Sequence, residues 1–145
     1  MSNNNNINLE LLNHIEKELS SFSKIIEKPS PDIWFCEIIE NQLYGFVSCE
    51  LNEEDINIPT ISFSLSIRDI TNTSRQQIID LFSLNGKLHA CSFSADVIDN
   101  KLILFINRRI MVSSYQVGEL EANIYLMLNQ LDVFSPEINY ILENN

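Results

Sequence analysis

The sequence has 145 residues, the length of one ordinary domain, and its hydrophobic fraction of 45% is typical of a globular protein with a buried core. Twenty acidic residues against nine basic ones give a formal net charge of -11, which disfavours nucleic acid and anionic membranes as partners. The first residues lack the basic start of a signal peptide, and no stretch approaches the ~20 apolar residues of a membrane span, so we expect a cytoplasmic protein.

Apolar residues recur at helical spacing near the start of the chain, after a tail at 1–6 that we expect to be frayed. The spacing predicts an amphipathic helix of about five turns, which Pro29 and Pro31 should end. We expect residues 7–145 to form a single domain. The apolar face of the predicted helix consists of Ile7, Leu11, Ile15, Leu19, Phe22 and Ile26.

Three antiparallel strands are predicted next. Residues 33–40 and 43–51 are rich in aromatic and β-branched residues and predict a hairpin, and the acidic segment 52–57 predicts a second turn. The following strand should have one buried and one solvent-facing side, because apolar and polar residues alternate along it. Ile61, Phe63, Leu65 and Ile67 alternate there with Ser62, Ser64, Ser66 and Arg68.

A short helix and a second hairpin complete the predicted sheet. Ser74 and Gln77 have the spacing of a capping box, and Asn85-Gly86 should end the helix that they begin. Strands are predicted at 87–96 and 101–111, joined by a tight turn at Asp99-Asn100.

The last predicted helix begins near Ser114, and Ser135-Pro136 should kink or restart it. Its predicted apolar face contains Val117, Leu120, Ile124, Leu128 and Leu131. The whole order is α-β-β-β-α-β-β-α. We therefore predict an α+β fold in which helices pack on an antiparallel five-stranded sheet.

The sequence contains no recognisable catalytic or metal-binding motif. His89 and Cys91 are predicted on one strand face, where a base could in principle activate a thiolate, but no Asn or Asp is placed to orient the histidine. We favour packed side chains at both positions. Cys36, Cys49 and Cys91 form no CxxC pair, and so predict neither a disulfide framework nor a zinc site. We expect no enzymatic activity, metal or cofactor.

The first hairpin carries aromatic residues that are candidates for binding. Tyr44 and Phe46 share an otherwise polar strand face, which is either an exposed patch for a partner or a surface covered by the first helix. Trp34 lies on a strand that is apolar on both faces. Arg108-Arg109 is a basic pair in an acidic chain, and is either a strand-end pair facing water or an anchor for an acidic partner segment.

The second half of the chain resembles the small acidic chaperones of bacterial type III secretion and the YbjN-like domains that share their fold. The resemblance lies in IDLFSLNGKL, HACSFSADVIDNKLILFINRRI and ELEANIYLMLNQLDVF, and is best over residues 79–131. It implies a helix-sheet-helix sandwich, often dimeric through the middle helix. It also implies a non-enzymatic role in which the N-terminal segment of a secreted effector is held in extended form.

We therefore predict a non-catalytic, homodimeric protein-binding domain. A partner segment would add a strand to a sheet edge or fill pockets with its side chains. The alternatives are a YbjN-like regulatory or stress-response protein without a secreted client, and a toxin-neutralising immunity protein. The predicted dimer residues are Ile78 and Phe82, and the predicted partner-binding residues are Phe22, Trp34, Tyr44 and Phe46.

Overall fold

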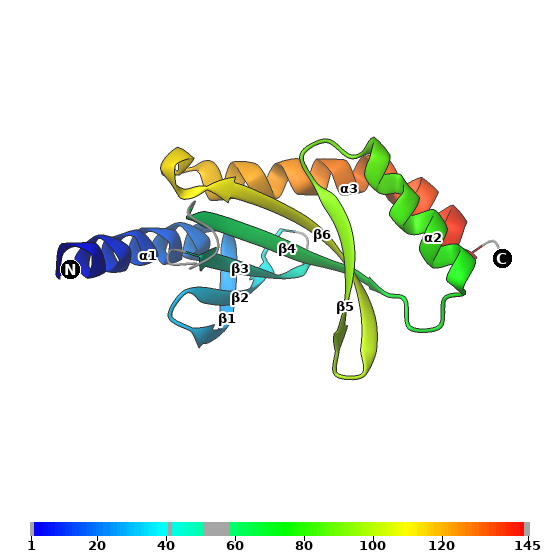
Figure 1. Cartoon of the computed structure of the whole chain (residues 1–145), viewed down its shortest axis with the longest axis horizontal. Helices are drawn as coiled ribbons and strands as arrows, with labels where there is room; N and C mark the ends of the chain where they lie inside the picture. Colours follow the sequence, from blue (N-terminus) through cyan, green and yellow to red (C-terminus); the bar gives the residue numbers. More distant parts are fainter. Residues whose placement is uncertain (1, 41, 51–58, 144–145) are drawn as a thin grey trace.

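The computed structural model describes residues 2–40, 42–50 and 59–143, with side chains from residue 9 onward, so the predicted turn at 52–57 lies outside the described residues. The described chain has an α+β fold with an antiparallel sheet, as the sequence predicts (Figure 1). The elements in chain order are α1 (Ser2–Phe22), β1 (Ser23–Ser30), β2 (Ile33–Ile38), β3 (Tyr44–Glu50), β4 (Thr60–Asp69), α2 (Arg75–Ser83), the short 3-10 helix η1 (Leu84–Lys87), β5 (Ser92–Ile98), β6 (Lys101–Met111), the short 3-10 helix η2 (Val112–Ser114) and α3 (Glu119–Glu143).

Six strands of the described chain form one sheet in the order β1-β2-β3-β4-β6-β5, and each neighbouring pair is antiparallel. The first four strands form a meander. β6 then pairs with β4 and leaves β5 at the far edge. Asp99 and Asn100 join β5 to β6 with φ angles of 51° and 62°, the left-handed values that the predicted tight hairpin turn requires.

The predicted number of five strands was wrong, because residues 23–30 form β1 instead of extending the first helix. α1 ends at Phe22, where the hydroxyl of Ser23 donates a hydrogen bond of 2.6 Å to the carbonyl oxygen of Leu19. From there the chain pairs with β2 along the register Ser23↔Ile38. Backbone pairing with β2 therefore outweighs the helical pattern of the side chains.

The apolar residues keep their helical spacing into β1 although β1 is a strand, and the predicted helix was therefore too long. Ile26 fits the four-residue repeat, but it lies on the strand with 45% of its surface exposed. Its neighbour Ile25 packs against the core instead. Pro29 is tolerated because β1 is an edge strand, where one row of N–H groups has no partner strand.

One face of the sheet and the α-helices α1, α2 and α3 share a single core (Figure 1). The strand residues of this core alternate along the chain with residues on the opposite face, as predicted for β4 as far as Ser66, where a register shift interrupts the alternation before Arg68. The helices contribute Ile15, Leu19, Leu81, Leu120, Ile124, Met127, Leu128, Leu131, Phe134 and Ile138, and the strands contribute Trp34, Cys36, Ile38, Val47, Cys49, Ile61, Phe63, Leu65, Phe93, Leu104 and Ile106.

α3 begins at Glu119 and not near Ser114. Val117 lies before the helix and is 82% exposed, so it does not belong to the apolar face as predicted. The helix runs through Pro136 without interruption, and the predicted restart there was wrong. No helix of the described residues is long and apolar enough to cross a membrane.

The predicted capping box of α2 is confirmed, and it has a second role. The N–H of Gln77 donates to the hydroxyl of Ser74 (3.1 Å), and the N–H of Ser74 donates to Oε1 of Gln77 (2.8 Å). The Nε2 of Gln77 also donates to the carbonyl oxygens of Ile141 and Leu142, both at 3.2 Å. The start of α2 is thereby joined to the end of α3. Gly86 does not end α2 in a left-handed conformation, because the chain continues into η1.

Candidate functional site: the open face of the sheet

The face of the sheet opposite the core carries the candidate site. Within the described residues no helix packs on this face, and we name it the open face. Strand alternation and the pairing register place its residues. They include Phe35 from β2, Tyr44 and Phe46 from β3, Ser62, Ser64 and Ser66 from β4, Ser92, Ser94 and Asp96 from β5, and Phe105, Asn107 and Arg109 from β6.

Three aromatic side chains form a cluster at one end of the open face. Phe35 is stacked on Tyr44 with ring centroids 5.9 Å apart, and it meets Phe46 at 4.9 Å in a tilted arrangement. Tyr44 is 44% exposed, and Phe35 and Phe46 are half-buried. We name Phe35, Tyr44 and Phe46 the aromatic cluster. Ring pairs of this kind are rigid, and they present apolar surface with little loss of conformational entropy when a partner binds.

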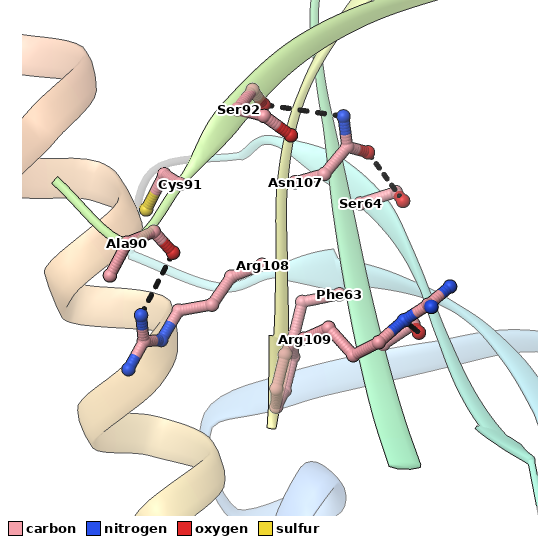
Figure 2. A pocket seen from close by; sticks show the side chains of 9 residues that line it. Phe63, Ser64, Ala90, Cys91, Ser92, Asn107, Arg108 and Arg109 are labelled. Atoms are coloured by element: carbon pink, nitrogen blue, oxygen red, sulfur yellow. Dashed lines mark hydrogen bonds between the residues drawn. The ribbon is translucent and has the colours of Figure 1, made fainter. Parts of the chain in front are cut away.

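The polar residues beside the aromatic cluster are hydrogen-bonded to one another. The hydroxyl of Ser64 donates to Oδ1 of Asn107 (2.8 Å), and Nδ2 of Asn107 donates to the hydroxyl of Ser94 (2.7 Å) and to the carbonyl oxygen of Ser92 (3.3 Å). Figure 2 shows Ser64, Asn107 and Ser92 in this chain of contacts. Because these groups already have partners, covering them with another molecule costs less desolvation free energy than covering unpaired ones.

A pocket of about 230 Å³ opens on the same face, beside the aromatic cluster. Phe105 is only 5% exposed there, although it faces away from the core. Phe46 belongs both to the aromatic cluster and to the pocket wall, so the two features are continuous. We name this the Phe105 pocket. It is lined by Phe46, Ser64, Ser94, Asp96, Ile98, Phe105 and Asn107.

The four predicted partner-binding residues do not form one surface. Trp34 has no exposed surface, since it packs in the core under α1. Its Nε1 donates to Oε1 of Glu16 (3.0 Å), and Nζ of Lys28 lies 2.6 Å from the same oxygen. Phe22 is half-buried against the core at the end of α1. The first helix therefore covers Trp34 but leaves Tyr44 on the open face.

Arg108 and Arg109 point to opposite sides of β6 (Figure 2). Arg108 reaches toward the helices, where its NH1 donates to the carbonyl oxygen of Ala90 (2.9 Å) and its Nε donates to Asn123. Arg109 lies on the open face, where its Nε donates to Ser62 (3.1 Å). The pair is therefore not a single basic patch. Arg108 on β6 therefore links the loop that precedes β5, through Ala90, to α3, through Asn123.

The predicted arrangement of His89 and Cys91 on one strand was wrong, because β5 begins only at Ser92. Ala90 between them has a φ of 59°, which breaks the strand alternation. Burial raises the pKa of the Cys91 thiol, and the opposing effect of Arg108 is smaller. This direction is opposite to that of an activated thiolate. In the described residues no group of His, Cys, Asp and Glu has an arrangement that suits a metal ion.

The predicted dimer residues lie on α2. Ile78 and Phe82 are both half-buried, and Phe82 packs against the core of its own chain. The most exposed large apolar residue of this helix is Ile79, at 50%. In a dimer formed through α2, Ile79 would therefore offer more exposed apolar surface to the partner subunit than Ile78 or Phe82.

The sequence was also compared with known proteins. No protein-family model matches this chain, and no curated protein matches it significantly.

Three residues of the site were missed by sequence reasoning. Phe35 lies within the predicted strand at 33–40, but its pairing with Phe46 depends on the register between two strands, which the sequence does not state. Asp96 lies on β5 and Phe105 lies on β6, and the two residues come together only when these two strands pair. The available signal was the alternation of Phe105 and Asn107 with Leu104 and Ile106.

Proposed function

We propose that this protein is a cytoplasmic, non-catalytic protein-binding domain that holds an extended segment of a partner protein on its open face, as the type III secretion chaperones that it resembles hold their clients. The observation that carries the proposal is the aromatic cluster on a face that no described helix covers. Aromatic residues at the centre of an interface often contribute most of its binding free energy.

The polar part of the open face supports the same role. Serine hydroxyls and Asn107 are bonded within the sheet, as described above, so a partner need not supply a donor or acceptor for each of them. The apolar rings then account for most of the free energy gained when water leaves this face.

Both sheet edges are poorly suited to the addition of a strand. At the free edge of β5, the side-chain amide of Asn85 bonds both backbone groups of Phe93, accepting at 2.6 Å and donating at 3.1 Å. The N–H of Val97 donates to the side chain of Asp96 (2.9 Å). The other edge, β1, has an irregular register and contains Pro29. Natural sheets use such devices to prevent edge pairing, so a segment lying across the face is the mode that we propose.

A photo-crosslinking experiment in the native host tests the proposal. Tyr44 is replaced by a photoreactive phenylalanine analogue, and the matched control carries the analogue at Tyr125 on α3, which is also 44% exposed. We expect one dominant partner to crosslink at position 44 and not at position 125. Mass spectrometry of the crosslinked peptide should locate the contact in one short segment of the partner.

Each other result has a definite meaning. Equal crosslinking at both positions, or none at position 44, would refute binding at the open face. If the captured partner were a nuclease or pore-former that is inactive in the complex, the hypothesis of a toxin-neutralising immunity protein would replace the hypothesis of a chaperone.

A further inference from the structure

The Phe105 pocket combines an apolar floor with one carboxylate. Phe46, Ile98 and Phe105 supply the apolar surface, and Asp96 lies at the exposed margin on β5. Oδ1 of Asp96 accepts a hydrogen bond of 2.9 Å from the N–H of Val97, which holds the carboxylate in place. Among the described residues, no lysine or arginine lies within ion-pair distance of Asp96. The pocket thus has a negative group without a cationic partner among the side chains that the structure describes.

Lysine and arginine side chains match this arrangement. Each has an apolar stem that packs on hydrophobic surface and a cationic head that remains near water or an acid. A wholly apolar side chain would fill the floor but would remove water from Asp96 without a compensating charge. An acidic side chain would be repelled both by Asp96 and by the net charge of -11.

We propose that the Phe105 pocket binds one lysine or arginine side chain of the partner segment, an inference that rests on the proposed binding at the open face. Phe46 joins the pocket to the aromatic cluster, so one extended segment places an apolar residue on the cluster and a basic residue in the pocket. The preferred client segment is therefore basic and apolar in composition, complementary to an acidic protein.

Synthetic peptides test this inference. We would titrate the full-length protein, labelled with nitrogen-15, with Ac-Ser-Phe-Ser-Xaa-Ser-Val-Ser-NH₂, in which Xaa is lysine, norleucine or glutamate. We expect the lysine peptide to bind about threefold to fivefold more tightly than the norleucine peptide, which corresponds to the upper range for an exposed ion pair. The amide signals of Ser94, Asp96 and Asn107 should shift during the titration. The glutamate peptide should bind most weakly.

Two variants serve as the matched pair. Asp96→Asn keeps the shape of the side chain and an oxygen for the N–H of Val97, and it should abolish the preference for lysine over norleucine. Asp132→Asn removes the same charge from an exposed position on α3 and should leave that preference unchanged. Added salt should weaken the preference in the unmodified protein.

The outcomes separate this inference from the proposed function. Equal affinity of the lysine and norleucine peptides, with shifts on the open face, would overturn the assignment of the pocket and leave binding at the face intact. Shifts confined to another surface, or no binding by any of the three peptides, would count against both.

Discussion

The carboxylate of Glu18 in α1 accepts a hydrogen bond of 3.0 Å from the backbone N–H of Glu121, in the first turn of α3. The same carboxylate accepts from the N–H of Gly118 (2.9 Å) and from the hydroxyl of Tyr115 (3.1 Å). Glu18 is only 8% exposed. It therefore supplies from another helix the cap that α3 lacks in its own sequence, and its negative charge lies at the positive end of the helix dipole.

We predict that Glu18→Ala destabilises the protein by about 2–4 kcal/mol, because buried donors at the start of α3 lose a charged acceptor. Urea denaturation, followed by the fluorescence of the buried Trp34, measures the change. Glu10→Ala on the exposed side of the same helix is the control and should change stability by less than about 0.5 kcal/mol. A similar small change for Glu18→Ala would show that the cap contributes little.

A second prediction concerns the pH dependence of stability. Burial, and then the adjacent carboxylate of Glu18, raises the pKa of Tyr115 above its usual range. In the unfolded chain the phenol ionises at pH ~10, which is lower than in the folded protein. The contribution of Tyr115 is therefore complete below that pH and is lost as the pH rises toward the folded-state pKa.

Tyr115→Phe should make the loss of stability between pH 9 and pH 11 smaller than in the unmodified protein. It should not abolish that loss, because burial also raises the pKa of Cys49, to about 11. Urea denaturation across this pH range checks the prediction, with Tyr44→Phe on the open face as the control. An unchanged slope in Tyr115→Phe would contradict it.

Much of the fold follows from local sequence patterns. The predicted bounds of the strand at Lys101–Met111 match β6, and the capping box of Ser74 and Gln77 forms as expected, because both depend on neighbouring residues. The contact between Glu18 and Glu121 joins positions 103 apart, and nothing local indicates it. β1 was missed for a related reason, since its conformation is set by pairing with β2.

The candidate site was predictable only in part. Alternation assigned Tyr44 and Phe46 to the polar face of β3, and they lie there. Alternation could not say which face the helices cover, so Trp34 was grouped with them although it is buried under α1. A β-bulge between Ser66 and Arg68 likewise turns Arg68 to the helix side, where it donates to Asn139 (2.7 Å).

A third prediction concerns the close contact of β3 and β4. A Cβ atom on Gly45 would lie 2.6 Å from Cδ2 of Leu65 and 2.7 Å from the carbonyl oxygen of Ser64. The carbonyl belongs to the sheet backbone and cannot move away freely. Gly45→Ala should therefore destabilise the protein by about 1–3 kcal/mol in urea denaturation.

Gly86→Ala is the matched control for this substitution. A Cβ at Gly86 meets nothing within 4 Å, and the residue does not adopt a left-handed φ. The stability of the Gly86→Ala variant should be unchanged or raised by up to about 1 kcal/mol, because alanine lowers the conformational entropy of the unfolded chain. Equal effects of the two substitutions would contradict the steric explanation.

A fourth prediction tests the dimer that the resemblance implies. If α2 forms the interface, Ile79 is its most accessible large apolar residue, and Ile79→Glu should convert a dimer to a monomer in size-exclusion chromatography with light scattering. Val133→Glu on α3, at a position 66% exposed, is the control and should leave the dimer intact. A monomeric unmodified protein would rule out the predicted homodimer.

The last prediction concerns the edge of β5. In an antiparallel ladder, the residues that bond the partner strand alternate with those that point away from it. The backbone N–H and C=O groups of Phe93 point away from β6 and bond the side chain of Asn85. By the same alternation, the backbone groups of Ala95 and Val97 also belong to the free edge. Asn85→Ala exposes both backbone groups of Phe93. We expect a stability loss of about 1–2 kcal/mol and self-association that increases with concentration, because unpaired strand edges recruit other strands.

Sedimentation velocity over a range of protein concentrations measures this self-association. Asn129→Ala, at an exposed position on α3, is the control. Asn85→Asp keeps an acceptor for the N–H of Phe93 but loses the donor to its carbonyl group, and should give an intermediate result. If Asn85→Ala remains as dispersed as the control, the hydrogen bonds of Asn85 to Phe93 are not what prevents strand addition at this edge.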